Sequence, residues 1–176
     1  NAAATQFTWT QEDTKPTMTI TASQGSSGFT SNDAALSLTF TSSEATANFV
    51  VGDIQVSNCA LSNFQSNGGS TTVYTATCTA TADGATTIDV AASGFTDASG
   101  NQNSAATQFN WLQDDTAPTM VNTASEGSSG FTSNDAALSL TFTSNEATSN
   151  FAVGDIQVTN GALSSFQSNG GSTTVY

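Results

Sequence analysis

The stretch FTSNDAALSLTFTS, residues 29–42, occurs again without change at residues 131–144. In its second half, Leu36, Leu38 and Phe40 alternate with serine and threonine. Such alternation predicts a strand with one buried face and one solvent-facing face. Because the whole stretch recurs, this strand is expected once in each structural unit of a repeat.

The repeat extends well beyond these fourteen residues. Residues 1–74 align with residues 103–176 without a gap, and 60 of the 74 pairs are identical. The period of 102 residues suits a small domain with its own core and is too long for a solenoid repeat. We therefore expect residues 1–12 to be the last strand of a preceding repeat, 13–114 a complete repeat and 115–176 an incomplete second repeat.

The complete repeat has the pattern of seven short strands and of no long helix. The expected strands are 16–23, 35–41, 53–57, 60–65, 71–80, 86–92 and 105–112, with one helical turn in NFVVGD at 48–53. The residues expected to face inward are Leu36, Leu38, Phe40, Ile54, Val56, Tyr74, Ala76, Cys78, Ile88, Val90, Phe109 and Trp111. Seven strands joined by turns rich in Gly, Asn, Asp and Ser predict an all-β fold of tandem immunoglobulin-like sandwiches.

The odd number of strands has a consequence for the array. If successive strands run up and down, seven of them bring the chain in at one end of the sandwich and out at the other. Successive units are then expected to follow one another end to end.

Charge excludes several classes of function. The chain has 14 acidic residues and a single basic one, Lys15, and therefore a formal net charge of -13. Nucleic acids and anionic membranes are bound mainly through Lys and Arg, so neither is an expected partner, and no apolar run is long enough to insert into a membrane. Without histidine the commonest general base and zinc ligand are missing. A carboxylate pair could still hydrolyse glycosides, but an isolated sandwich offers no obvious cleft, and we predict no enzyme.

The two cysteines are expected to form a disulfide. Cys59 and Cys78 flank the hairpin turn SNGG. If Gly68 and Gly69 lie at the middle of this hairpin, the two cysteines sit directly opposite each other at a separation that suits a disulfide. Such a bond implies an oxidising, extracellular setting, and two buried free thiols are the alternative. In the second repeat Gly161 replaces Cys59, so the fold does not require the bond.

Two tryptophans occupy equivalent positions in successive repeats. Trp9 follows Phe7 by two residues, and Trp111 follows Phe109 in the same way. A platform for stacking sugars is one interpretation. A core position on the last strand is favoured, because each tryptophan keeps the period of its phenylalanine.

Acidic residues concentrate in the loops expected at the two ends of the sandwich. The residues expected at one end are Asp13, Glu44, Asp97 and Asn101, with Asp115 and Glu146 in the second repeat. Asp33 and Asp83 are expected at the other end, facing the segment QDDTAP. Oxygen ligands from several loops, without nitrogen or sulfur donors, favour calcium. Asp and Asn also occupy such loops because they form turns and keep the surface soluble, so both interpretations stay open.

Several longer motifs resemble one known family. They are DTAPTM at 115–120, NFVVGDIQVSN at 48–58, ADGATTIDVAA at 82–92 and FTDASGN at 95–101. In this order they resemble the bacterial Ig-like repeats of very long cell-surface adhesins. The resemblance implies seven-stranded sandwiches stacked end to end and exported to the cell surface. It also implies calcium at domain junctions, held by linker and loop acids such as Asp13, Asp97, Asp114 and Asp115.

These observations predict a structural spacer or stalk in a long extracellular adhesin or surface filament. Near-identical copies favour this function, because a spacer needs length more than diversity. The expected partners are neighbouring copies of the repeat and, in a filament, other chains joined through exchanged strands. An extracellular glycan- or protein-binding Ig-like module is the alternative, and it would need an exposed aromatic platform.

Overall fold

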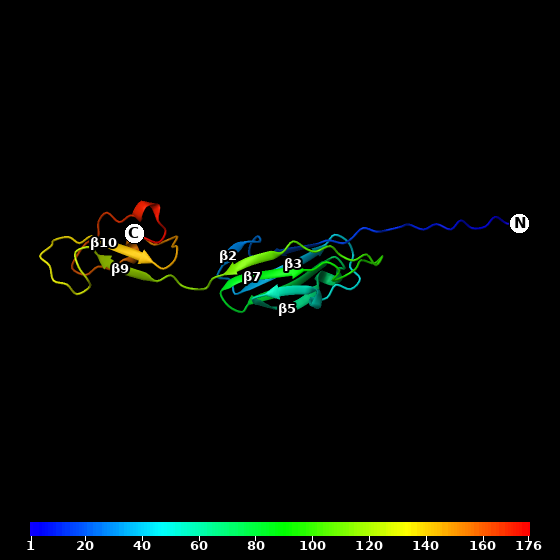
Figure 1. The fold of residues 1–176 in the computed structure, drawn as a ribbon, viewed down its shortest axis with the longest axis horizontal. Coiled ribbons are helices and arrows are strands. Elements are labelled where there is room, and N and C mark those ends of the chain that lie inside the picture. The colour runs from blue at the N-terminus through cyan, green and yellow to red at the C-terminus, as the bar shows by residue number, and fades with distance from the viewer. The chain divides into compact units, whose positions relative to one another are not determined.

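The computed structural model describes residues 1–176, which form two compact units, Asn1–Asp115 (unit 1) and Thr116–Tyr176 (unit 2). Unit 1 contains eight strands and no α-helix (Figure 1). The strands are β1 (Met18–Ala22), β2 (Phe29–Ser31), β3 (Ala35–Ser42), β4 (Ile54–Ser57), β5 (Cys59–Ser66), β6 (Val73–Ala80), β7 (Gly84–Val90) and β8 (Phe109–Gln113). Two short 3-10 turns, η1 (Val51–Asp53) and η2 (Asn67–Gly69), lie before β4 and after β5.

The strands of unit 1 form two four-stranded sheets. One has the order β1-β3-β6-β5 and the other the order β2-β8-β7-β4. The residues buried on β3, β6, β7 and β8 alternate with exposed or half-buried ones, so each sheet turns one face toward a shared core. The all-β immunoglobulin-like prediction is confirmed.

All seven expected strands are present, and one more was missed. The additional strand, β2, has only three residues and pairs in parallel with β8, with Phe29 opposite Trp111 and Ser31 opposite Gln113. Three residues are too few to display an alternation, and the pairing partner lies about 80 residues later in the chain. Nothing local in the sequence could therefore indicate this strand.

The path of the chain gives unit 1 two distinct ends. Because β2 and β8 are parallel, β2 continues the direction of β1, and the eight strands make seven passes. The chain accordingly enters the sandwich at one end, here named the N-terminal pole, and leaves at the other, the C-terminal pole (Figure 1).

The core of unit 1 contains the expected inward residues, of which Val56 is only partly buried, and it also contains residues outside that list, among them Met18 and Ile20 of β1. Leu36, Leu38 and Phe40 are at most 1% exposed, as the pattern of residues 35–42 requires. Phe49 and Phe95 are also buried, although both lie in loops. Phe49 packs against Phe40, Phe64, Tyr74 and Phe95 with ring centroids 5.1 to 6.0 Å apart. Because loop residues have no strand period, periodicity could not identify this aromatic cluster.

Unit 2 has fewer paired strands than unit 1. It contains β9 (Met120–Ala124), β10 (Leu140–Ser144) and the 3-10 turns η3 (Val153–Asp155) and η4 (Asn169–Gly171). These elements correspond to β1, β3, η1 and η2 of unit 1. The counterparts of β4 and β5 form no strands, because residues 116–176 include almost nothing equivalent to β6 and β7, with which β4 and β5 pair.

Candidate functional site

Three carboxylates meet at the N-terminal pole of unit 1. Glu12 precedes β1, Glu44 follows β3 and Asp97 lies between β7 and β8, and one ligand oxygen from each lies within 4.8 Å of the other two. An isolated β-bridge between Thr46 and Asp97 holds the two loops side by side. The sequence predicted Glu44, Asp97 and Asn101 at this end, and the structure brings them together.

Asp97 is the fixed member of the cluster. Its side chain is 4% exposed, and Oδ1 accepts hydrogen bonds from the backbone N–H groups of Ser99 and Asn101, both at 2.8 Å. The Asn101 amide nitrogen donates to Asp97 Oδ2 at 2.9 Å and to Glu12 Oε2 at 2.6 Å. The loop FTDASGN therefore forms a local turn, and its Asn101 bridges the carboxylates of Asp97 and Glu12.

The environment shifts the pKa values of two of the carboxylates, Asp97 and Glu44, in opposite directions. Burial acts to raise the pKa of Asp97, but the hydrogen bonds from Asn101 and Ser99 lower it overall. Desolvation, together with the negative charges of Glu12 and Asp97, raises the pKa of Glu44. The cluster is thus a concentration of negative charge, built only from oxygen ligands, that a bound cation would relieve.

The remaining acids expected at this pole lie elsewhere. Asp13 is exposed, and the neighbouring Glu12 occupies the cluster instead. Glu12 aligns with Asp114, which was among the acids expected to bind calcium. The alignment of the two repeats could therefore have identified Glu12 as a candidate ligand. In unit 2 the counterpart of Glu44 is Glu146, whose Oε1 is buried without a hydrogen-bond partner.

The acids expected at the C-terminal pole divide into two groups. The Asp33 carboxylate accepts a hydrogen bond from the Ser31 hydroxyl at 2.8 Å and takes part in a local turn. Asp83 and Asp115 are neighbours, because the Asp115 backbone N–H donates to Asp83 Oδ1 at 3.0 Å. A side-chain hydrogen bond with Asp83, and then the negative charge of Asp83, raise the pKa of the Asp115 carboxyl.

The disulfide between Cys59 and Cys78 is confirmed, with 5.7 Å between the two Cα atoms. The expected register was wrong, because Cys59 lies opposite Ala80 and Cys78 lies opposite Leu61. A register shift between Ser62 and Gln65 and an asymmetric turn at η2 move the strands past each other by two residues. The bond therefore joins diagonal neighbours on one face of the sheet. Gly68 and Gly69 do not lie at the middle of the hairpin, as the sequence analysis assumed.

The two tryptophans have different environments. Trp111 is 1% exposed and lies in the core, as the favoured interpretation predicts. Trp9 is 72% exposed and Phe7 is 86% exposed, which the core interpretation of these two residues did not predict. Trp111 lies on β8, which pairs with β7 on one side and β2 on the other. Trp9 lies in residues 1–12, which form no strand and have no such neighbours.

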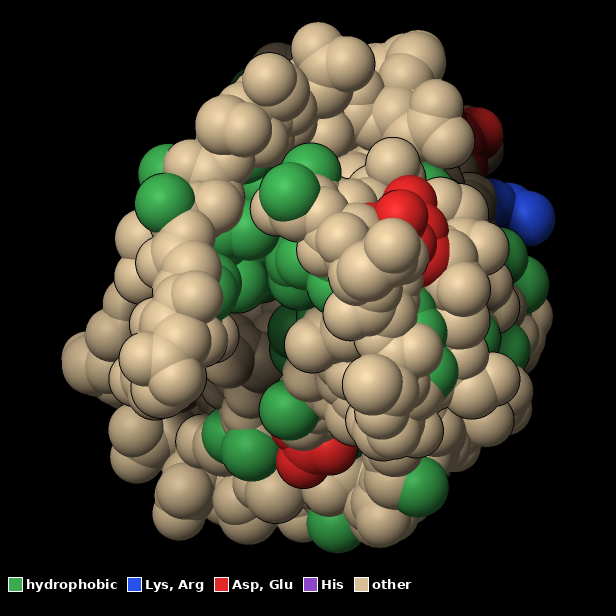
Figure 2. All heavy atoms as spheres, turned by 90° about the vertical axis from the view of Figure 1, so that its left-hand side faces the viewer, with side chains coloured by type: hydrophobic (Ala, Val, Ile, Leu, Met, Phe, Trp, Pro, Cys, Tyr) green, Lys and Arg blue, Asp and Glu red, His purple; other side chains and the backbone are tan.

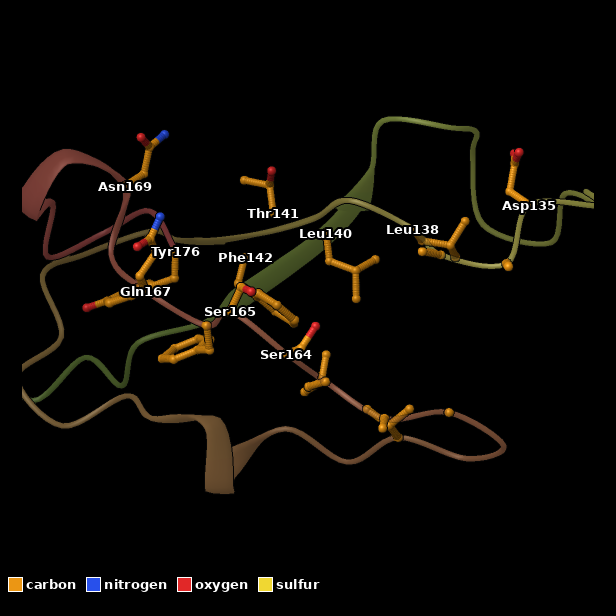
Figure 3. Close-up of a pocket in the computed structure, with 17 residues that line it drawn as sticks. Asp135, Leu138, Leu140, Thr141, Phe142, Ser164, Ser165, Gln167, Asn169 and Tyr176 are labelled. Atoms are coloured by element: carbon orange, nitrogen blue, oxygen red, sulfur yellow. The ribbon is translucent and has the colours of Figure 1, made fainter.

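A hollow in unit 2 is an uncovered core. It has a volume of about 640 Å³ and is walled by apolar side chains that include Leu138, Leu140 and Phe142 (Figure 2). In Figure 3, Leu140 and Phe142 point toward the segment that carries Ser164, whereas Thr141 points away. Leu140 is 40% exposed, whereas its unit 1 counterpart Leu38 is 1% exposed beneath the other strands. The hollow is therefore the inner face of a sandwich and not a ligand pocket.

The comparisons with known proteins agree with this fold. The family model of the bacterial Ig-like domain matches residues 12–112 and 114–176. The chain belongs to the bacterial Ig-like domain family. No curated protein and no solved structure matches this chain. Ig-like domains of this kind are generally non-catalytic modules of extracellular proteins. None of the helices is long and apolar enough to cross a membrane.

Proposed function

We propose that this chain is a structural spacer in a long extracellular adhesin or surface filament, with neighbouring repeats as its partners. The observation that carries the proposal is the path through unit 1, which enters at one pole and leaves at the other. Each added unit then adds length, and tension runs along the strands. The Cys59–Cys78 disulfide supports an extracellular location, because disulfides persist in oxidising compartments.

A stretching experiment tests whether unit 1 carries load. Held by its two ends in optical tweezers, the 176-residue chain is expected to show one discrete unfolding step for unit 1, because β2 and β8 are loaded along their length. Cys59 and Cys78 are 19 residues apart, so the intact bond withholds roughly 65 Å of extended chain. Reduction is expected to lengthen the step by that amount. Gradual extension without a step would contradict a load-bearing function.

The location has its own test. An antibody against unit 1 is expected to label intact source cells without permeabilisation. Labelling that requires permeabilisation would overturn the extracellular assignment, whatever the mechanical result.

We further propose that Ca²⁺ binds the N-terminal cluster of Glu12, Glu44 and Asp97. The fit rests on three carboxylates that each place a ligand oxygen within 4.8 Å of the other two. Desolvation, and then the negative charges of Glu12 and Asp97, raise the pKa of Glu44. Calcium prefers oxygen ligands and tolerates irregular geometry, and extracellular modules bind it with a Kd on the order of 10⁻⁴ to 10⁻³ M. The bound ion would tie the segment that enters unit 1 to two of its loops.

Substitutions of equal charge test this site. Glu44→Gln is expected to weaken calcium binding and the accompanying rise in the thermal midpoint of unit 1. Asp33→Asn removes the same charge from a local turn and is the matched control. Equal calcium responses in both variants and in the unmodified chain would refute the site.

A further inference from the structure

The turn that joins β5 to β6 contains an asparagine followed by a glycine. In the sequence SNGGS, Asn67 precedes Gly68 in the 3-10 turn η2, and both residues are exposed. Asn169 and Gly170 form the same pair in η4 of unit 2, where SNGGS recurs. Such a pair is prone to spontaneous deamidation, because glycine has no Cβ to hinder the attack of its backbone nitrogen on the preceding side chain.

The asparagine side chain in this turn is free to react. Asn67 takes part in the turn only through its backbone carbonyl, which accepts a hydrogen bond from the Ser70 N–H at 3.1 Å, and its side-chain amide makes none. The Asn169 side chain points away from the apolar residues of the hollow in unit 2 (Figure 3). Asn103 is instead 2% exposed and held by three side-chain hydrogen bonds. A side chain without such bonds can turn its Cγ toward the nitrogen that follows it.

The glycines of the two turns leave room for a new ring. A Cβ at Gly68 or at Gly170 would meet no heavy atom within 4 Å. A third asparagine–glycine pair, Asn160 and Gly161, is more crowded, because a Cβ at Gly161 would lie 3.2 Å from Val158 Cγ1. The surroundings therefore distinguish pairs that the sequence alone makes equivalent.

We propose that Asn67 and Asn169 are sites of spontaneous deamidation in the folded protein. The backbone nitrogen of the following glycine loses its proton to hydroxide and attacks Cγ of the asparagine, which closes a succinimide ring. The bond from Cγ to the side-chain nitrogen breaks, and that nitrogen takes a proton from water and leaves as ammonia. Water then opens the ring at either carbonyl carbon. The products are aspartate and isoaspartate, and the net reaction consumes one water and releases one ammonia.

The modification adds negative charge to a turn that the fold can spare. The amide is neutral and the product is a carboxylate, and η2 lies at the N-terminal pole, where Glu12, Glu44 and Asp97 already meet. Isoaspartate also lengthens the backbone of the turn. The hairpin is closed independently by the bond between Cys59 and Cys78, so it stays formed and modified turns accumulate with the age of the chain. The reaction depends on neither the spacer function nor bound calcium.

Peptide mapping of the 176-residue chain by mass spectrometry tests the proposal. The folded chain is incubated at mildly acidic and at mildly alkaline pH, and each asparagine is followed through the mass increase from amide to acid. Asn63 is also exposed but precedes Phe64, so it is the matched control. Conversion at Asn67 and Asn169 is expected to be about tenfold faster or more, which corresponds to about 1.4 kcal/mol of activation free energy. The rates are expected to rise with pH, because the attacking nitrogen must lose its proton.

Two comparisons separate the effect of the turn from that of the sequence. In the folded chain Asn160 is expected to react more slowly than Asn67, whereas in urea the asparagine–glycine pairs are expected to react at similar rates, because unfolding removes their different surroundings. Gly68→Ala is expected to slow the reaction at Asn67 and to leave Asn169 of the same molecule unchanged. Equal rates at Asn67 and Asn63 in the folded chain, or conversion of Asn67 in urea alone, would overturn the proposal.

Discussion

Removal of the disulfide by Cys59→Ala is the sharpest test of how unit 1 is stabilised. Cys59 is only partly buried, whereas Cys78 is fully buried in the core, so replacing Cys59 breaks the bond with the smaller loss of packing. The bond closes a loop between residues 19 apart, and the chain-entropy relation gives about 3 kcal/mol for a loop of this length. A domain of roughly 100 residues loses about 4 to 8 °C for each kcal/mol, so the midpoint is expected to fall by roughly 12 to 24 °C.

Tryptophan fluorescence follows this change in unit 1 alone. The chain contains two tryptophans, of which Trp111 is buried in unit 1 and Trp9 is exposed. In a Trp9→Phe background, the signal of Trp111 reports the unfolding of its own sandwich. Reductant is expected to lower the midpoint of the oxidised chain toward that of Cys59→Ala and to leave the variant unchanged. A variant within a few degrees of the oxidised chain would show that the bond does not restrain the unfolded state.

Four further substitutions test the packing, the turns and the charges. Phe49→Ala is expected to cost about 3 to 5 kcal/mol of unfolding free energy in denaturant titrations, because Phe49 is the centre of the aromatic cluster. Gly52→Ala is expected to stabilise unit 1 by about 0.4 to 1 kcal/mol, because a Cβ at residue 52 meets only open space. Gly69→Ala is expected to destabilise unit 1 by about 1 to 2 kcal/mol, because residue 69 has a φ of +81°. Equal effects of the two substitutions would refute the argument from backbone conformation. Hydrogen bonds, first from Ser125, lower the pKa of Glu126, so its stabilising effect is present above the unfolded pKa and is lost as the pH falls through the folded value. Glu126→Gln is therefore expected to reduce the acid sensitivity of unit 2 in pH titrations of its unfolding.

The sequence predicted most of the fold because the strands of unit 1 have one buried face each. Alternation at Leu36, Leu38 and Phe40 identifies inward residues with no knowledge of their partners. The sequence pattern does not show which residues of two strands lie opposite each other. The parallel strand β2 and the diagonal disulfide both depend on register, and register is set by turns and bulges such as that at Asn63, where φ is 52°.

The sequence predicted which loops meet at a candidate site, but it did not predict which side chains of those loops meet. Alternating strand directions correctly placed Glu44, Asp97 and Asn101 in one group, since topology alone decides which loops share a pole. The choice of Glu12 over Asp13 depends on which side of an irregular segment each side chain occupies.

The two repeats also show that near-identity does not ensure an equivalent core. In β1 the residues Thr19 and Ile20 place the apolar side chain inward, and Ile20 is 8% exposed. The counterparts in β9 are Val121 and Asn122, which reverse the order of polar and apolar side chains. Val121 is 60% exposed on the outer face, and Asn122 lies opposite Phe142. A polar side chain at an inward position adds little apolar burial, so β9 is held mainly by its backbone pairing with β10. The identical stretch at 131–144 therefore forms only the shorter strand Leu140–Ser144 in unit 2, and its neighbour across the ladder does not reproduce the packing of unit 1.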